Sequence, residues 1–296
     1  MSLFQITKSV ASLAACILLS SPVQALPVET QALAQRNPAS SKRIAMWDYR
    51  NSRDIQTNGY PNLRATAASL AGSHFTMASD WDTLLPPELP DSVLFVPQVR
   101  TLEHLSGDHW NNLLNVVAKQ GSNTVVQYVN EPDFNGISVD AALQHWGQLV
   151  QLRVEKGVKI TSPALTSDPN RAHWLREFMS RLSPEQKPDF VATHFYTTQG
   201  QPCESEMAWG KDYMQKLHAE YQLPLWVNEI ASTSRDQAEV NQFVNEMSAW
   251  MDAQPWIAAY GFTGMSREVA DDFSSPASLL LTSDGSWSPL GQLLHG

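Results

Sequence analysis

The chain has 296 residues, of which 43 % are hydrophobic, and its 20 Lys and Arg stand against 30 Asp and Glu, giving a formal net charge of −10. The apolar content excludes intrinsic disorder, and the acidic excess, without any block of Lys or Arg, argues against nucleic acid as a partner. The two cysteines, Cys16 and Cys203, are too few for a disulfide framework or a cysteine-based zinc site.

The N-terminal residues resemble a secretory signal. Met1–Lys8 carries one basic residue, residues 10–20 form an apolar run, and Val23-Gln24-Ala25 offers a small-residue cleavage site. We therefore expect residues 1–25 to be removed and the protein to be secreted. The alternative is a lipoprotein box at Leu13-Ala14-Ala15-Cys16, but the apolar run continues beyond that cysteine. No later apolar stretch reaches the length of a membrane span.

After a polar segment, residues 26–42, short apolar runs alternate with helical patterns up to residue 296, which is typical of βα units and a parallel sheet. The expected strands are Arg43–Trp47, His74–Ala78, Val93–Gln98, Thr124–Val129, Lys159–Pro163, Phe190–Tyr196, Leu225–Glu229 and Ala258–Thr263. The clearest expected helices are His109–Lys119, Val139–Lys156 and Ala238–Ala253. Residues Ser138 and Ser183 suit N-caps or turns, and Gly121 and Gly157 suit helix ends.

This order of elements predicts an α/β protein whose residues 43–296 form one domain. A (β/α)8 TIM barrel typically takes about 250 residues in a single domain, so it fits the length. An open doubly wound sheet is the alternative, but the chain has neither a Gly-x-Gly-x-x-Gly motif nor a phosphate-binding loop. We therefore expect a single-domain barrel that needs no nucleotide or other cofactor.

Two of the expected strands end in a glutamate. The run Val125-Val126-Gln127-Tyr128-Val129-Asn130-Glu131 is followed by Pro132, which stops the strand, and Leu225-Trp226-Val227-Asn228-Glu229 ends alike. In a barrel, the carboxyl ends of all strands meet at the rim where catalytic residues lie. Two carboxylates at one rim can share glycoside hydrolysis, one as the acid and the other as a nucleophile or base.

Five ordered motifs resemble glycoside hydrolase family 128, over about residues 44–294. They are Asn130-Glu131-Pro132-Asp133, Ser162-Pro163-Ala164, Trp174-Leu175-Arg176-Glu177-Phe178, Thr193-His194-Phe195-Tyr196 and Trp226-Val227-Asn228-Glu229. The resemblance implies a retaining (β/α)8 enzyme of clan A that cleaves β-1,3-glucan, here as an endo-acting hydrolase.

By that resemblance Glu131 is the general acid/base and Glu229 the nucleophile. Asn130 would bind the sugar 2-hydroxyl, and His194 and Tyr196 would line the cleft near the nucleophile. The first, third and eighth strands depart from the family's pattern, at Met46-Trp47-Asp48-Tyr49-Arg50, Pro97-Gln98 and Phe262. These departures bear on the subsites and therefore on the exact substrate.

The aromatic and histidine residues suggest further roles. Trp47, at the end of the first strand, could form a platform for a sugar ring, and Trp81 and Trp209 are weaker candidates near the rim. The histidines His104, His109, His173 and His218 match no metal-ligand spacing, so we expect no metal. The expected partner is a β-glucan, and we expect a monomer. The alternatives are a non-catalytic β-glucan-binding barrel and a clan A hydrolase that acts on another β-glycan.

Overall fold

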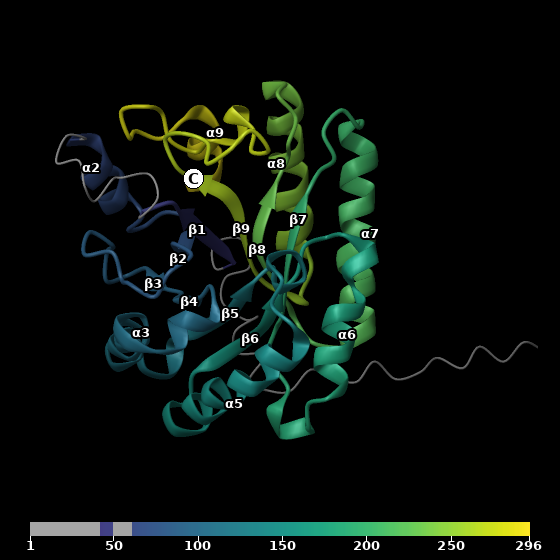
Figure 1. Cartoon of the computed structure of the whole chain (residues 1–296). Helices are drawn as coiled ribbons and strands as arrows, with labels where there is room; N and C mark the ends of the chain where they lie inside the picture. Colours follow the sequence, from purple (N-terminus) through teal and green to yellow (C-terminus); the bar gives the residue numbers. More distant parts are fainter. Residues whose placement is uncertain (1–41, 50–60) are drawn as a thin grey trace, which may run out of the picture.

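The computed structural model describes residues 42–49 and 61–296 (Figure 1). The expected signal peptide and the polar segment up to residue 41 therefore lie outside the described residues. Lys42, the last residue of that segment, is buried, and its amine donates three hydrogen bonds to backbone carbonyls at the C-terminal end of helix α8 (Gln237–Ala253). The folded part thus includes Lys42, one residue before the expected bound.

The strands of the described residues pair in parallel throughout, as the alternation of elements predicts. They are β1 (Arg43–Trp47), β2 (Phe75–Ser79), β3 (Leu94–Phe95), β4 (Gln98–Val99), β5 (Val125–Asn130), β6 (Lys159–Ala164), β7 (Val191–Tyr196), β8 (Leu225–Ala231) and β9 (Ile257–Met265). One sheet has the order β3-β2-β1-β9-β8-β7 and the other has the order β4-β5-β6.

Two features connect the sheets. Parallel bridges join Thr161 to Phe190 and Leu165 to Thr193, so the edge of β6 lies against β7. Strands β3 and β4 are two parts of the single expected strand Val93–Gln98. The interruption includes Pro97, which has no backbone N–H to donate to a neighbouring strand.

Helices surround the strands (Figure 1). They are α2 (Pro61–Ser69), α3 (Gly107–Gln120), α4 (Pro132–Asn135), α5 (Val139–Lys156), α6 (His173–Ser180), α7 (Cys203–Tyr221), α8 and α9 (Pro289–His295). The bounds of α5 are those expected, because Ser138 accepts a hydrogen bond from the Ala141 N–H and Gly157 takes up a left-handed conformation after the last turn. Among helices in the described residues, none is both long and apolar enough to cross a membrane.

Helix α7 has no clear apolar periodicity in the sequence, although it is 19 residues long. Its buried face includes Glu206 and Gly210, and neither residue contributes to a hydrophobic pattern in the sequence. A Cβ atom on Gly210 would come within 2.8 Å of the Phe195 ring, so only glycine permits this approach of helix to strand. The packing that defines α7 is therefore not visible as a hydrophobic pattern.

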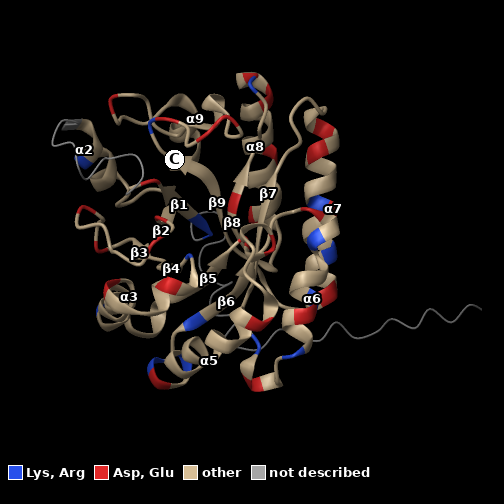
Figure 2. Cartoon of the chain, in the orientation of Figure 1, with Lys and Arg blue, Asp and Glu red and all other residues tan. Residues whose placement is uncertain are grey.

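The core has two layers. The larger cluster fills the space between strands and helices, and a smaller one, which includes Ile44, Met46, Val125, Phe190 and Trp226, joins side chains of strands from both sheets. Charged side chains lie mostly on the helices and loops outside these layers (Figure 2). Because polar and charged groups are costly to bury without partners, those that lie among the strand ends mark a candidate site.

Candidate active site

Glu131 follows β5 directly, at a sharp turn of the chain. Its backbone takes up the left-handed conformation, with φ 43° and ψ 55°, and Pro132 begins helix α4 at the next position. A left-handed conformation costs a non-glycine residue roughly 1–2 kcal/mol. The turn is secured by the Glu131 N–H, which donates to the carbonyl of Ala164 at the end of β6, at 2.8 Å. The carboxylate of Glu131 is thereby set at the carboxyl end of the strands.

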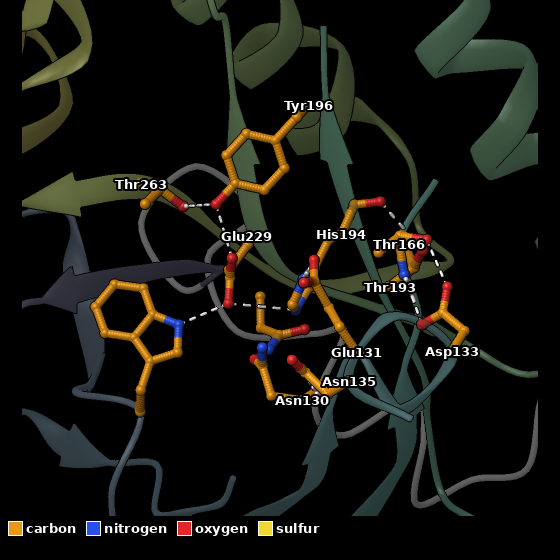
Figure 3. Close-up of polar contacts among 12 residues, drawn as sticks. Asn130, Glu131, Asp133, Asn135, Thr166, Thr193, His194, Tyr196, Glu229 and Thr263 are labelled. Atoms are coloured by element: carbon orange, nitrogen blue, oxygen red, sulfur yellow. Dashed lines mark hydrogen bonds and ion pairs between the residues drawn. The ribbon is translucent and has the colours of Figure 1, made fainter. Parts of the chain in front are cut away.

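Glu229 lies within β8 and is held on both oxygens. The Trp81 indole N–H donates to Oε1 at 2.6 Å, and the Tyr196 hydroxyl donates to Oε2 at 2.7 Å (Figure 3). The hydroxyl of Tyr196 also lies 3.2 Å from that of Thr263. Burial, followed by the charge of Glu229, raises the pKa of Tyr196 well above its usual value, so its phenol stays a donor.

His194 lies between the two glutamates. Its Nδ1 is 2.8 Å from Oε1 of Glu131, and its Nε2, which makes no hydrogen bond of good geometry, is 3.4 Å from Oε1 of Glu229. Its side chain is fully buried. One carboxylate oxygen of each glutamate and one ring nitrogen all lie within 4.8 Å of one another. The sequence motifs on β5, β7 and β8 therefore meet at one point.

The charges in this group shift the proton equilibria of its members. Burial lowers the pKa of His194, but the carboxylates of Glu229 and Glu131 outweigh burial and the net shift is upward. Burial raises the pKa of Glu131, but the hydrogen bond and charge of His194, with smaller effects of Arg100 and Arg171, produce a net downward shift. Both net shifts have the same cause, the attraction between the His194 ring and the neighbouring carboxylates.

A cavity of about 810 Å³ opens over the pair. Four of the expected site residues, Asn130, Glu131, Tyr196 and Glu229, line this cavity. The Oδ1 atom of Asn130 accepts a hydrogen bond from the Gln98 side chain at 3.1 Å. Because that contact orients the amide, the Nδ2 group of Asn130 is the part that can donate to a ligand.

His194 and Trp47 differ from the expectations. His194 does not line the cavity as expected but contacts both glutamates from behind, with its side chain fully buried. Trp47 is 1 % exposed and packs against Tyr49 in the outer core, so its ring offers no face to a sugar and the expected platform is wrong. The reason is the period of two along a strand: Met46 points between the strands and Trp47 therefore points toward the helices.

Three residues to which the sequence analysis assigned no definite role, Trp81, Arg100 and Asp133, complete the site. Trp81, named above only as a weaker candidate, both lines the cavity and binds Glu229, and Arg100 lines the cavity from the end of β4. Asp133 accepts hydrogen bonds from the backbone and hydroxyl of Thr166, so it orients the loop after Glu131. Because Trp81 and Arg100 follow the ends of expected strands, their positions could have suggested that they lie near the site. Their positions could not have shown which residues they contact.

The described residues contain two groups with metal-ligand atoms close together: the Glu131, His194 and Glu229 group, and a second group of Asp82, His104 and His109. In the first group His194 lies between the two carboxylates, with one ring nitrogen near each. The second group is not apparent from the spacing of its residues in the sequence.

Fold and site define a class of protein. Two carboxylates share one cavity at the strand ends, and the glycosyl hydrolase catalytic core model matches residues 58–294. The chain belongs to this group and, within it, to glycoside hydrolase family 128. An exo-β-1,3-glucanase of this family, subgroup VI, from Aureobasidium namibiae is 30 % identical, with a TM-score of 0.73, and the match covers 87 % of this chain and 97 % of that one.

Two further proteins are similar to this chain at lower sequence identity. A subgroup I endo-β-1,3-glucanase from Amycolatopsis mediterranei, solved with laminaritriose and laminaribiose, is 21 % identical with a TM-score of 0.63, covering 80 % of this chain and 95 % of that one. Alkali-sensitive linkage protein 1 of Schizosaccharomyces pombe is 27 % identical over 207 residues, which are 65 % of this chain and 37 % of that protein. The chain thus matches little more than a third of this curated relative.

Proposed function

We propose that the protein is a retaining glycoside hydrolase that cleaves β-1,3-glucan by double displacement. The observation that carries the proposal is that a carboxylate oxygen of Glu131 lies within 4.8 Å of one of Glu229, and that both residues line the cavity. Carboxyl groups about 5–5.5 Å apart favour a covalent intermediate, whereas inverting enzymes keep them roughly 6.5–9.5 Å apart to admit a water. The substrate class is supported by the related enzyme at 30 % identity.

Glu131 enters the first step as the carboxylic acid, with the proton that it takes from water when the preceding cycle ends. Glu229 then attacks the anomeric carbon while Glu131 gives this proton to the glycosidic oxygen, so the C–O bond to the leaving sugar breaks and a glycosyl ester forms. Because Oε1 of Glu131 contacts His194, its other oxygen is the one that carries the proton to the leaving group. In the second step, Glu131 removes a proton from water, and the water oxygen displaces Glu229 from the sugar.

The surroundings of the pair suit these roles. Donors from Trp81 and Tyr196 hold the Glu229 carboxylate in one direction, as a nucleophile requires. Glu131 is more exposed, with 21 % of its side chain accessible, and faces the space where a leaving group and then water must enter. Asn130 would donate to the sugar 2-hydroxyl, a contact that strengthens as positive charge develops on the ring.

We also propose that the strands close into a (β/α)8 barrel. The bridges between β6 and β7, and the continuity of β3 and β4 within one segment, support closure of the two sheets into one ring of eight positions. The inner core cluster, with side chains from strands of both sheets, supports it too. In a closed barrel, β5 and β8 would stand three positions apart, with side chains meeting across the rim.

The deciding experiment uses the purified protein with laminarin oligosaccharides and follows the anomeric proton of the first-formed product by NMR. Retention of the β-configuration is the expected result, and α-product would contradict the proposed double displacement. A panel of β-1,4- and β-1,6-glucans and mannans tests the substrate, because faster cleavage of one of these would assign the enzyme to another β-glycan. Tight laminarin binding without product, unchanged in Glu229→Gln, would indicate the non-catalytic alternative.

The products also reveal the mode of cleavage. The family resemblance led us to expect endo action, whereas the related Aureobasidium enzyme is named as exo-acting and the Amycolatopsis enzyme as endo-acting. We propose endo cleavage, for which a ladder of oligosaccharides is the expected early product. Glucose released alone from the start would identify exo cleavage instead.

We further propose that the protein is exported and acts as a monomer on glucan outside the cytoplasm. The proposal is supported by the signal-like residues 1–25 and by the acidic composition. N-terminal sequencing of the protein from culture medium should begin at Leu26. Acylation at Cys16, detected by mass spectrometry, would instead support lipid attachment, and sedimentation would test the monomer.

A further inference from the structure

Two largely exposed phenylalanine rings line the catalytic cavity. Phe134 lies in α4 and is 66 % exposed, and Phe273 lies in the segment after β9 and is 57 % exposed. Both line the same cavity as Glu131 and Glu229. Because covering an exposed aromatic ring removes apolar surface from water, a ring in this position favours a ligand that presents an apolar face of its own.

The contacts of Phe134 hold its ring in one place. Its backbone N–H donates to the carbonyl of Glu131 at 3.0 Å. The guanidinium of Arg171 lies over the ring, 5.3 Å from its centroid. Arg171 is itself held, because it donates to the Asp133 carbonyl and its Nε lies 3.2 Å from Oδ2 of Asp168. One face of the ring is therefore backed by a fixed cation, and the exposed surface is left for the cavity.

Phe134 lies on the side of the cavity from which the leaving group departs. It follows Glu131 by three residues, and the guanidinium over its ring acts on the same carboxylate: burial raises the pKa of Glu131, whereas His194 and, more weakly, Arg171 lower it. In the proposed mechanism Glu131 protonates the oxygen that leaves with its sugar. The leaving sugar is therefore bound beside Glu131, on the side where Phe134 lies.

Phe273 lies on the side of the nucleophile. Its ring centroid is 5.3 Å from that of Tyr196, whose hydroxyl donates to Glu229. The Phe273 N–H donates to Oδ1 of Asp271 at 3.0 Å, so this segment also holds its ring in place. Since Glu229 bonds to the sugar that stays on the enzyme, Phe273 provides a comparison for Phe134 within the same cavity.

From these contacts we propose that Phe134 binds the glucosyl unit of the leaving group by stacking on the apolar face of its pyranose ring. The inference rests on the proposed function and names the residue that recognises the substrate on the leaving-group side. A β-glucosyl ring suits such a platform, because its equatorial hydroxyls leave axial C–H bonds on both faces. Ser167 and Asp168, which also line the cavity, offer hydrogen bonds to the hydroxyls at the edge of that ring.

The test compares two substrates that differ in the leaving group. Laminarihexaose releases a sugar, whereas β-laminaribiosyl fluoride releases an ion too small to stack on Phe134. The ratio of kcat/KM for the first substrate to that for the second should fall at least about fivefold in Phe134→Ala, and Phe134→Tyr should restore it, because tyrosine keeps the ring face. Phe273→Ala is the matched control and should leave this ratio unchanged. Circular dichroism should show an unchanged fold, since both rings are largely exposed.

Glycosyl transfer gives a second readout. Added laminaribiose can replace water in the second step: its hydroxyl oxygen bonds to the anomeric carbon, the ester bond to Glu229 breaks, and the hydroxyl proton passes to Glu131. With β-laminaribiosyl fluoride as the donor, the ratio of transfer product to hydrolysis product should fall at least about fivefold in Phe134→Ala and not in Phe273→Ala. Unchanged ratios in Phe134→Ala, or equal losses in Phe273→Ala, would overturn the inference.

Binding without turnover separates this inference from the proposed function. In the Glu229→Gln background, adding Phe134→Ala should weaken the binding of laminarihexaose at least about fivefold, as measured by calorimetry. Unchanged affinity in this double variant would overturn the role of Phe134. Wild-type protein that cleaves neither substrate would refute the proposed function instead, and the binding measurement would then decide on Phe134 by itself.

Discussion

The ends of β5 and β8 carry the same residue type in different surroundings. Glu229 lies within its strand and is held by Trp81 and Tyr196, with 9 % of its side chain exposed. Glu131 follows its strand in a left-handed turn, contacts His194, and is 21 % exposed. A nucleophile must be fixed in direction, whereas an acid/base must exchange its proton with a leaving group and then with water. Under the proposed mechanism, the same residue type serves these two separate needs because its surroundings differ at the two strand ends.

Replacing the carboxylate at the more rigid end should have the largest effect. Glu229→Gln keeps the size of the side chain but removes the nucleophile, and we expect kcat/KM on laminarin to fall by on the order of 10⁴- to 10⁶-fold. Circular dichroism should show an unchanged fold. Wild-type turnover in this variant would refute the assignment of the nucleophile.

At the more exposed carboxylate, Glu131, the loss of cleavage rate on replacement should depend on the leaving group of the substrate. Glu131→Ala removes the acid, so cleavage of unactivated glucan should fall by about 10²- to 10⁴-fold, while aryl glucosides with good leaving groups are spared in the first step. Azide should partly restore turnover of these activated substrates, because it needs no base to attack the glycosyl ester. Equal losses on both substrate types would contradict the difference between the two ends.

Removing either hydrogen-bond donor to Glu229, Tyr196 or Trp81, should have a smaller effect on turnover than replacing Glu229 or Glu131. Tyr196→Phe and Trp81→Phe each remove one hydrogen bond to a charged carboxylate, worth about 1.5–3 kcal/mol, so each should lower kcat by about 10- to 150-fold. Trp47→Phe is the matched control, because Trp47 lies outside the cavity and its replacement should affect stability and not kcat. A kcat loss in Trp47→Phe as large as in Trp81→Phe would contradict these placements.

The smallest expected effect concerns the pH dependence of stability. The fold raises the pKa of His194, so this residue stabilises the protein fully below its unfolded pKa of about 6.5, and the contribution is lost as the pH rises through the higher folded value. The melting temperature of the wild type should therefore fall over this range, and that of His194→Asn should fall less. Parallel curves for the two proteins would show that His194 is not charged in the fold.

Local patterns were sufficient for much of the fold. The bounds of α5 follow from a capping serine, an apolar stripe and a terminal glycine, all within one segment. Helix α7 and the divided strand at Pro97 were less apparent, because the first depends on close packing of Gly210 and the second on pairing with two different neighbours. Such features depend on residues that are distant in the chain.

The sequence by itself determined the parallel α/β order of elements, the family and the two glutamates, because each lies in a short motif whose chemistry is local. The tertiary structure decided what surrounds them: that Trp81 and not Trp47 faces the cavity, that His194 lies behind the glutamates, and that Asp82, His104 and His109 meet. The direction of a side chain depends on strand parity and on contacts between loops far apart in sequence, and these exist only once the strands have paired.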